Sequence, residues 1–498
     1  DDDDAVVGAV GLSDLSPALL ADSILSHVSL NERARFSCVC RAGKAAGDAR
    51  MVKLDLTPEA NVSDAMLESL GRKGGAEEIE LCGHSGVSIG ALVGMFAANE
   101  ATLRSVRAVD VGVRGLNPSE LLKVFESCPH LESIEVDVSA QKPNKELVQV
   151  LKDKRLRVGH LRVGCCRAQP TPKELSGDWT RLAAVLAEGH GSVRVLSLNG
   201  ARLGAQGISL LPQVLAAGST ARMESLELCR NRLGTPGALG RLTPALCDSG
   251  PSLRRLDLSD NMLQDTAAEL EPVLRHNPHL TEVNVSSNRI SNAGADGLAA
   301  GLADNHSLTS LDLCFNLCSR SMHAVYAAVE GHEALECIDA RHVGLPVPAA
   351  EALSRSLASF PKLKSLMLAF NGVEKEAASL VALSLESEGC VLTTLQLSCN
   401  NISPEGGEAL ARALRTNAHL TQLSLSCCGL DAESVGAIAL ALEEDNRTLK
   451  KLELGGNEIE PVTAGDLASM LCENQVLEEL DLSCNEVKDL GAWELAEA

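Results

Sequence analysis

The feature that most constrains this chain is a short row of leucines and one asparagine that returns along most of its length. The row is clearest at Leu253, Leu256, Leu258, Asn261 and Leu263, which gives Leu-x-x-Leu-x-Leu-x-x-Asn-x-Leu. Sixteen such rows begin at Met51, Ala76, Leu103, Leu131, Val158, Val193, Met223, Leu253, Leu280, Leu308, Leu335, Leu363, Leu392, Leu420, Leu449 and Leu477. From the sixth row onward they follow one another every 27 to 30 residues, which leaves room for a strand, a turn and a helix in each unit.

Composition and periodicity favour the same architecture. The chain is 45% hydrophobic but contains only 6 Phe, 2 Trp and 1 Tyr, so aliphatic side chains must fill its core. Alternation at Leu395-Gln396-Leu397 predicts a strand, and the apolar spacing over 406–414 predicts an amphipathic helix. The expected fold is an α/β solenoid over 48–498, a horseshoe with a concave parallel sheet and convex helices in about 16 repeats.

Two recurring asparagines mark the turns of the repeat. The first, at the ninth position of the row, is expected to bond the backbone where the chain leaves the strand. It occurs at Asn231, Asn261, Asn288, Asn316, Asn371, Asn400, Asn457 and Asn485. The second lies three residues before the next row, where we expect a helix to end in a left-handed conformation. It occurs at Asn277, Asn305, Asn417, Asn446 and Asn474.

These rows resemble the 28- and 29-residue repeats of ribonuclease inhibitor, which also occur in nucleotide-binding immune receptors and Ran GTPase-activating proteins. The resemblance covers roughly nine-tenths of the chain. It implies a leucine-rich-repeat solenoid that serves as a binding surface for proteins, without enzymatic activity and without a cofactor. The ninth position departs from the pattern at His84, Ser139, Cys166, Ala201, Val343 and Cys428, so the early rows deviate most.

The fifth position of each row is expected to point onto the concave sheet, because it lies between two inward leucines. Nine of these sixteen residues are acidic and two, Arg107 and Arg162, are basic. The acidic ones include the predicted partner-binding residues Glu227, Asp257, Asp312, Asp339, Glu453 and Asp481. Two explanations are open: a protein partner with a basic patch, or an ordinary solvated sheet in a chain of net charge −23. Either one disfavours nucleic acid, whose phosphates would be repelled.

Two further features are candidate contacts. Phe315 and Phe370 occupy the eighth position, at the lip of the strand, where they either anchor an interface or are partly buried between turns. An irregular insertion near 169–179 contains Trp179 and is either a contact element or a surface loop.

The segment 1–47 precedes the repeats and predicts two or three short helices within 12–47. It resembles an F-box, as in F-box proteins with leucine-rich repeats, and the resemblance implies docking to the adaptor of a cullin-RING ubiquitin ligase. The matching contacts are Leu15, Pro17, Leu19, Leu20, Ile24 and Val39. Gly43 stands where the family has an aromatic residue, and Pro17 lies later than usual. The alternative is a helical cap that shields the first repeat from water.

Several classes of site are not predicted. The 17 cysteines form no regular disulfide frame and no pair of CxxC motifs, so we expect reduced thiols and no metal. Nucleotide-binding and hydrolase motifs are absent. No apolar run approaches the ~20 residues of a membrane span, and 1–30 lacks the order of a signal peptide. We therefore expect an intracellular, cytoplasmic protein, with a nuclear or organelle-associated location also open. The missing initiating Met and an end at Ala498 inside a helix suggest a longer natural chain or a partner that covers the last repeat.

Three functions remain open at this stage. The first is a ubiquitin-ligase substrate receptor that holds a basic substrate on the concave face. The second is a scaffold subunit of a larger axonemal or organellar assembly. The third is a GTPase-activating protein similar to the Ran type, for which no arginine of that family can be placed on this sequence.

Overall fold

The structure is a computed structural model of the 498-residue chain. It describes residues 203–216, 223–247 and 253–498 without a break. It also describes 36–42, 49–56, 78–82, 94–95, 97–99, 101–109, 130, 133–136, 160–162, 183–184, 186 and 193–200. The chain divides into two compact units, Asp1–Asn231 and Arg232–Ala498, both built from the same repeat.

The strands of the first unit confirm the predicted rows. They are β1 (Phe36–Ala42), β2 (Ala49–Leu56), β3 (Glu78–Cys82), β4 (Ser105–Val109), β5 (Ser133–Val136), β6 (His160–Arg162), β7 (Val195–Ser197) and β8 (Ser225–Glu227). β2 contains the first position of its row, and β3 to β8 each begin two residues after theirs. Parallel pairing joins β2 through β5, and likewise β6 through β8. Helix α7 (Gly204–Ala216) follows β7.

Strand β1 differs from what the N-terminal segment predicts. Phe36–Ala42 pairs antiparallel with β2, so the helices expected within 12–47 do not include these seven residues. Phe36 and Val39 in the stretch FSCVCRA have high strand propensity, which favours a strand here. Val39, expected as a helical docking contact, therefore lies in a strand. The rest of 1–47 lies outside the described residues.

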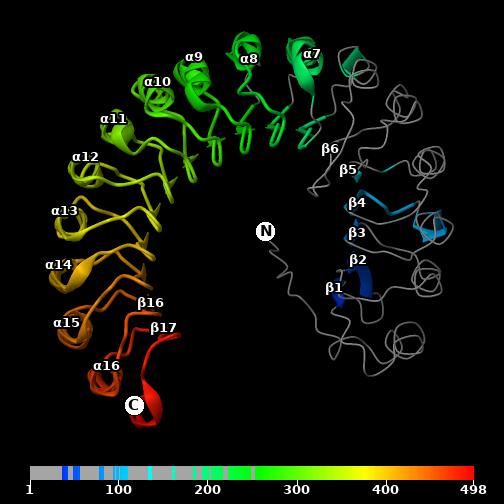
Figure 1. Cartoon of the computed structure of the whole chain (residues 1–498). Helices are drawn as coiled ribbons and strands as arrows, with labels where there is room; N and C mark the ends of the chain where they lie inside the picture. The colour runs from blue at the N-terminus through cyan, green and yellow to red at the C-terminus, as the bar shows by residue number, and fades with distance from the viewer. Residues whose placement is uncertain are drawn as a thin grey trace. The chain divides into compact units, whose positions relative to one another are not determined.

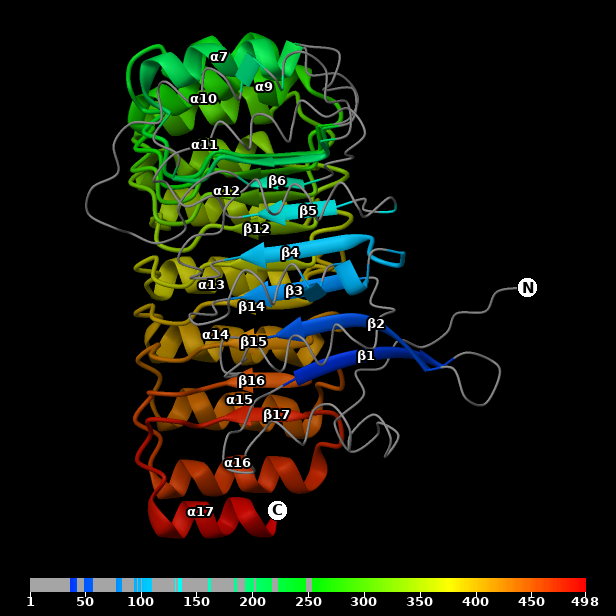
Figure 2. The same cartoon turned by 90° about the vertical axis from the view of Figure 1, so that its right-hand side faces the viewer.

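The second unit has strands on its inner side and helices on its outer side (Figure 1). Its strands are β9 (Arg255–Asp257), β10 (Glu282–Asn284), β11 (Ser310–Asp312), β12 (Cys337–Asp339), β13 (Ser365–Met367), β14 (Thr394–Gln396), β15 (Gln422–Ser424), β16 (Lys451–Glu453) and β17 (Glu479–Asp481). Each pairs parallel with the next, and fifth positions lie opposite fifth positions, as Asn284, Asp312 and Asp339 do. Figure 2 shows β14 to β17 stacked edge to edge in front of their helices.

Helical segments cover the sheet of this unit: α8 follows β8 of the first unit, and one segment follows each of β9 to β17. The segments are α8 (Ala238–Cys247), η3 (Gln264–Leu270) with α9 (Glu271–His276), α10 (Asn292–Leu302), η4 (Ser319–Ser321) with α11 (Met322–Ala328), α12 (Val347–Leu357), α13 (Lys375–Leu385), α14 (Ser403–Thr416), α15 (Ala432–Glu444), α16 (Pro461–Glu473) and α17 (Lys488–Glu497). The helix predicted over 406–414 is confirmed within α14. Among the described residues, no helix is long and apolar enough to cross a bilayer.

The core lies between these two layers and is aliphatic. Leu256, Leu258 and Leu263 are each at most 1% exposed, and the same positions of the neighbouring rows are equally buried. Such burial contributes roughly 1.5–3 kcal/mol per leucine side chain. Helices of adjacent repeats approach closely where glycine faces backbone: a Cβ at Gly301 of α10 would lie 2.7 Å from the carbonyl oxygen of Glu271. The spacing of the repeats therefore depends on both leucine rows and small helical residues.

The ninth-position asparagines bond the backbone as predicted. Asn288 is fully buried, and its Nδ2 donates to the carbonyl oxygens of Val285 in its own turn and Leu258 in the preceding turn, both at 2.9 Å. Its Oδ1 accepts the backbone N–H of Asn261 at 2.8 Å. Because each amide joins two successive turns, these residues form a ladder that fixes the register of the stack.

The second asparagine also joins repeats, but its expected left-handed backbone is wrong. Asn277 has φ −98° and ψ 98°, and Asn417 has φ −71° and ψ 124°, which are extended conformations. The side chain explains the difference. Nδ2 of Asn277 donates to the carbonyl oxygen of Leu246 in the preceding helix, and Oδ1 accepts the N–H groups of His279 and Leu280. The helix thus ends through a side-chain link, so no left-handed residue is needed at this position.

Candidate functional site

The predicted acidic face is found on the strand side of the second unit. Asp257, Asp312, Asp339 and Glu453 end their strands as half-buried residues, and Asp481 is exposed. Leucine or isoleucine next to them points into the core, which leaves the carboxylates on the opposite surface. The remaining predicted acid, Glu227, ends β8 in the first unit and accepts a hydrogen bond from Nδ2 of Asn199 at 3.0 Å.

The fifth-position carboxylates also have a structural role that the sequence did not reveal. Oδ1 of Asp257, Asp312 and Asp481 accepts the backbone N–H two residues further along, at 2.8–2.9 Å. Asn284 makes the same bond to the N–H of Ser286 at 2.9 Å, so an amide serves as well as a carboxylate. At these four positions an Asp or Asn oxygen caps the turn, and Asn284 shows that the negative charge is not needed for this bond.

Two of the acids have basic neighbours. The Arg341 guanidinium holds Asp339 through both Nε and Nη2, the latter 2.6 Å from Oδ2. Glu453 lies 3.2 Å from Nζ of Lys451 and accepts a hydrogen bond from the Ser424 hydroxyl. Asp312 differs from both, because no ion pair reaches it within the described residues. Partial burial raises the pKa of its carboxyl group above the usual value, a cost that a cation from outside would offset.

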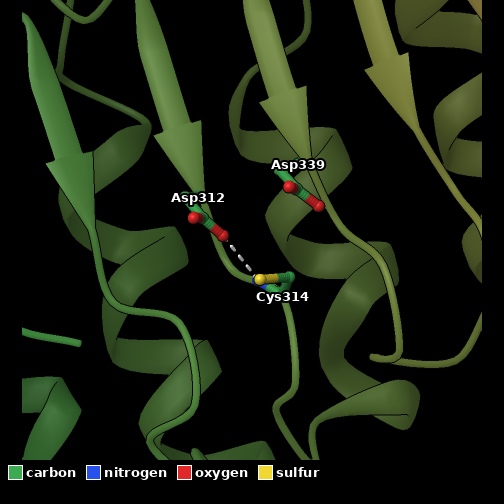
Figure 3. A group of neighbouring side chains, drawn as sticks. All are labelled: Asp312, Cys314 and Asp339. Atoms are coloured by element: carbon green, nitrogen blue, oxygen red, sulfur yellow. Dashed lines mark hydrogen bonds between the residues drawn. The ribbon is translucent and has the colours of Figure 1, made fainter. Parts of the chain in front are cut away.

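Asp312, Cys314 and Asp339 bring three possible metal-ligand atoms within 4.8 Å of one another (Figure 3). The chemistry of this group does not favour a metal ion. Burial and the neighbouring Asp312 raise the pKa of the Cys314 thiol to about 12, and Oδ1 of Asp312 already accepts the backbone N–H of Cys314. Asp339 is already bound by Arg341. The group is better explained as a turn cap beside an ion pair.

The predicted aromatic contacts are exposed and joined by a third ring. Phe315 is 51% exposed and Phe370 is 55% exposed. Between them lies His342, the eighth residue of the intervening row, whose ring centroid is 5.1 Å from that of Phe315 and 6.2 Å from that of Phe370. Interplanar angles of 28° and 21° make this a stack across three repeats. The adjacent Leu317 is 69% exposed. We call Phe315, Leu317, His342 and Phe370 the aromatic strip.

His342 was missed in the sequence because its row lacks the usual asparagine, with Val343 at the ninth position. Counting eighth positions from Leu335 would have found it. Of the other predicted contacts, Leu15, Pro17, Leu19, Leu20 and Ile24 lie outside the described residues, as does the insertion at 169–179.

Comparison with known proteins agrees with this geometry. A family model of the leucine-rich repeat matches residues 251–270, 276–299, 390–411, 416–439, 445–464 and 473–496. Pig ribonuclease inhibitor is 32% identical over 318 residues, which covers 57% of this chain and 68% of the inhibitor. The chain belongs to the ribonuclease inhibitor family of leucine-rich-repeat proteins.

Other relatives share the same repeats. The mouse member of this family, also named ribonuclease inhibitor, is 29% identical over 320 residues and aligns over 68% of its length. Human NACHT, LRR and PYD domains-containing protein 12 is 30% identical over 336 residues, which is 66% of this chain but only 30% of that protein. The family resemblance stated from the rows is thus confirmed, and it makes this chain a module for protein–protein interaction.

Proposed function

We propose that the chain binds a basic protein on the acidic strand face of its second unit and catalyses no reaction. The observation that carries this proposal is the row of half-buried fifth-position carboxylates, whose charge the fold does not require. Asn284 already serves at one of these positions without a charge. Charge at such positions is available for a partner, and opposite charges steer association. Because the matched relatives are named ribonuclease inhibitor, a ribonuclease is one partner to include in the test.

The test removes negative charges from the strand face and keeps the side-chain hydrogen bond that caps each turn. Substituting Asn for Asp257, Asp312 and Asp339 together preserves the Oδ1 acceptor and deletes three negative charges. A matched control deletes three negative charges by replacing Asp296 of α10, Glu408 of α14 and Asp466 of α16 with the corresponding amides, at positions exposed on the helical side. Binding to a panel of basic proteins, together with a ribonuclease, is measured by calorimetry at low and high salt.

We expect a salt-sensitive interaction that weakens about tenfold or more in the strand-face variant and stays near the wild-type affinity in the control. Equal affinities of the two variants would show that charge at these positions does not select the partner. A partner that remains bound regardless of salt would favour the scaffold alternative instead.

A narrower role, as an F-box-like substrate receptor of a cullin-RING ligase, is a second proposal that rests on the N-terminal resemblance. Leu15, Pro17, Leu19, Leu20 and Ile24 would contact the adaptor. Co-purification of the adaptor with the full chain, and its loss from a chain lacking residues 1–47, would support the role. Failure of both proteins to retain adaptor while staying folded would favour the cap.

A further inference from the structure

We infer that the aromatic strip is the apolar centre of the partner interface, and that it receives a segment carrying an apolar side chain next to a basic one. This inference rests on the proposed function and names the chemistry of the partner. The strip lies on the repeats that begin at Leu308, Leu335 and Leu363, the first two of which also carry Asp312 and Asp339. An apolar surface and a carboxylate without an ion pair thus occur on the same turns.

The fold does not explain why rings occupy these positions. In every row from Val193 onward the eighth residue has a positive φ, between 52° and 67°. The residues are Gly200, Arg230, Asp260, Ser287, Phe315, His342, Phe370, Cys399, Cys427, Gly456 and Cys484. Such a backbone costs a residue with a Cβ about 1 kcal/mol relative to glycine, and bulky residues are uncommon there. Glycine, serine and aspartate fill the same position in other repeats, so the turn places no demand for an aromatic side chain.

The rings are also scarce and exposed. Only six phenylalanines occur in 498 residues, and two of them lie at successive contacts of one stack with more than half of each side chain facing water. A third, Phe360, is 1% exposed in the core, which is the usual location for such a residue. A contiguous exposed apolar group of this kind marks an interaction site, and aromatic residues anchor protein interfaces.

The carboxylate of Asp312 indicates which kind of partner segment fits the aromatic strip. Arg341 engages Asp339, while Asp312 has no ion pair within the described part of the chain. Asp312 lies three residues before Phe315 on the same turn. A partner side chain that packs on the rings therefore brings its neighbours next to a carboxylate, and a lysine or arginine there would gain a counter-ion. A second copy of this chain, with its net charge of −23, is a poorer match.

The test compares two peptides of equal charge, one with Lys-Arg-Trp-Arg-Lys at its centre and one with Lys-Arg-Ser-Arg-Lys. Affinities are measured by fluorescence anisotropy for the wild-type chain and for a triple variant with Phe315→Ser, His342→Ser and Phe370→Ser. Serine is tolerated by the turn, since Ser287 occupies it at φ 54°. The control carries Leu383→Ser on α13 and Val462→Ser on α16, which remove exposed apolar side chains from helices.

We expect the wild type and the control to bind the tryptophan peptide about tenfold more tightly than the serine peptide, and the triple variant to bind both equally. Asp312→Asn should weaken both peptides. If the wild type binds both peptides equally, the strip is no anchor although the acidic face binds. If neither peptide binds, the acidic face itself fails, and this inference fails with it. A dimer in sedimentation that the triple variant dissociates would identify a second copy as the occupant and overturn the assignment.

Discussion

At the scale of single residues, the buried asparagine side chains of the ninth position make several hydrogen bonds each and link successive turns of the fold. Asn288 is fully buried and donates to carbonyls of two successive turns, while its oxygen accepts from the backbone of the repeat before it. A carboxylate of the same shape would have no proton to donate and would face these carbonyls with a negative charge. Where asparagine occupies the ninth position, as at Asn288, its amide therefore makes bonds that a carboxylate could not replace.

We expect Asn288→Asp to lower the free energy of unfolding by about 3 kcal/mol or more, because it leaves a buried charge without a partner. Asn485→Asp is the matched control, since Asn485 makes equivalent bonds to Leu454 and Leu482 but is only half-buried. Asn485→Asp should lower the free energy of unfolding by about 1 kcal/mol. Urea denaturation followed by circular dichroism measures both. Equal losses would mean that burial does not set the cost at this position.

His332 replaces the second asparagine of the repeat and adds a dependence on pH. Its Nδ1 accepts the N–H groups of Ala334 at 3.3 Å and Leu335 at 3.2 Å, just as Oδ1 of Asn305 accepts those of Ser307 and Leu308. Its Nε2 lies 3.3 Å from Oδ1 of Asn305, which suits the tautomer with the proton on Nε2. Burial, followed by the charge of nearby His306, lowers the pKa of His332 below 6.5.

A folded-state pKa below the unfolded value means that the folded chain prefers the neutral ring. The stability from this site is fully present above about pH 6.5 and is lost as the pH falls through the lower folded-state pKa. We expect His332→Asn to flatten the fall in urea midpoint between about pH 7 and pH 5, because an amide accepts the same N–H groups without titrating. His323→Asn, at an exposed histidine, should leave the slope unchanged. A slope unaltered by His332→Asn would place the titration elsewhere.

At the scale of elements, the contact between neighbouring helices depends on missing side chains. Gly301 of α10 faces the backbone of α9, where a Cβ would lie 2.7 Å from the Glu271 carbonyl oxygen and 3.0 Å from its Cα. Gly436 of α15 has a freer environment, with the nearest atom, a carboxylate oxygen of Asp466, at 3.6 Å. The same glycine-to-alanine change should therefore have opposite signs at the two positions.

We expect Gly301→Ala to destabilise by about 1–3 kcal/mol, since the backbone of α9 must move away. Gly436→Ala should instead stabilise by up to about 1 kcal/mol through its higher helix propensity. Thermal unfolding by calorimetry compares the two variants with the wild type. Stabilisation by both substitutions would show that α9 and α10 shift apart without cost.

At the scale of the whole molecule, the sequence predicted the features that recur in every repeat. The leucine rows located β2 to β17, because one inward and one outward position per strand is enforced in every turn. Features that occur only once were harder to predict from the sequence. The stack through His342 depends on three rings from three repeats. Phe36–Ala42, within the segment for which helices are predicted, forms β1 by pairing with β2. The extended backbone at Asn277 followed from a bond to Leu246, 31 residues earlier, which no local rule includes.

Stability in such a stack should follow the number of covered neighbours, because each repeat contacts only those beside it. Leu366 of β13 is fully buried between repeats, whereas Leu480 of β17 is half-buried at the corresponding position. We expect Leu366→Ala to cost about 2–5 kcal/mol and Leu480→Ala about 1 kcal/mol in the 498-residue chain. Hydrogen exchange should likewise be slower for the amides of β13 than for those of β17. Equal exchange rates and equal costs would mean that the second unit unfolds as one cooperative block, in which coverage of the last repeat has no effect on local opening.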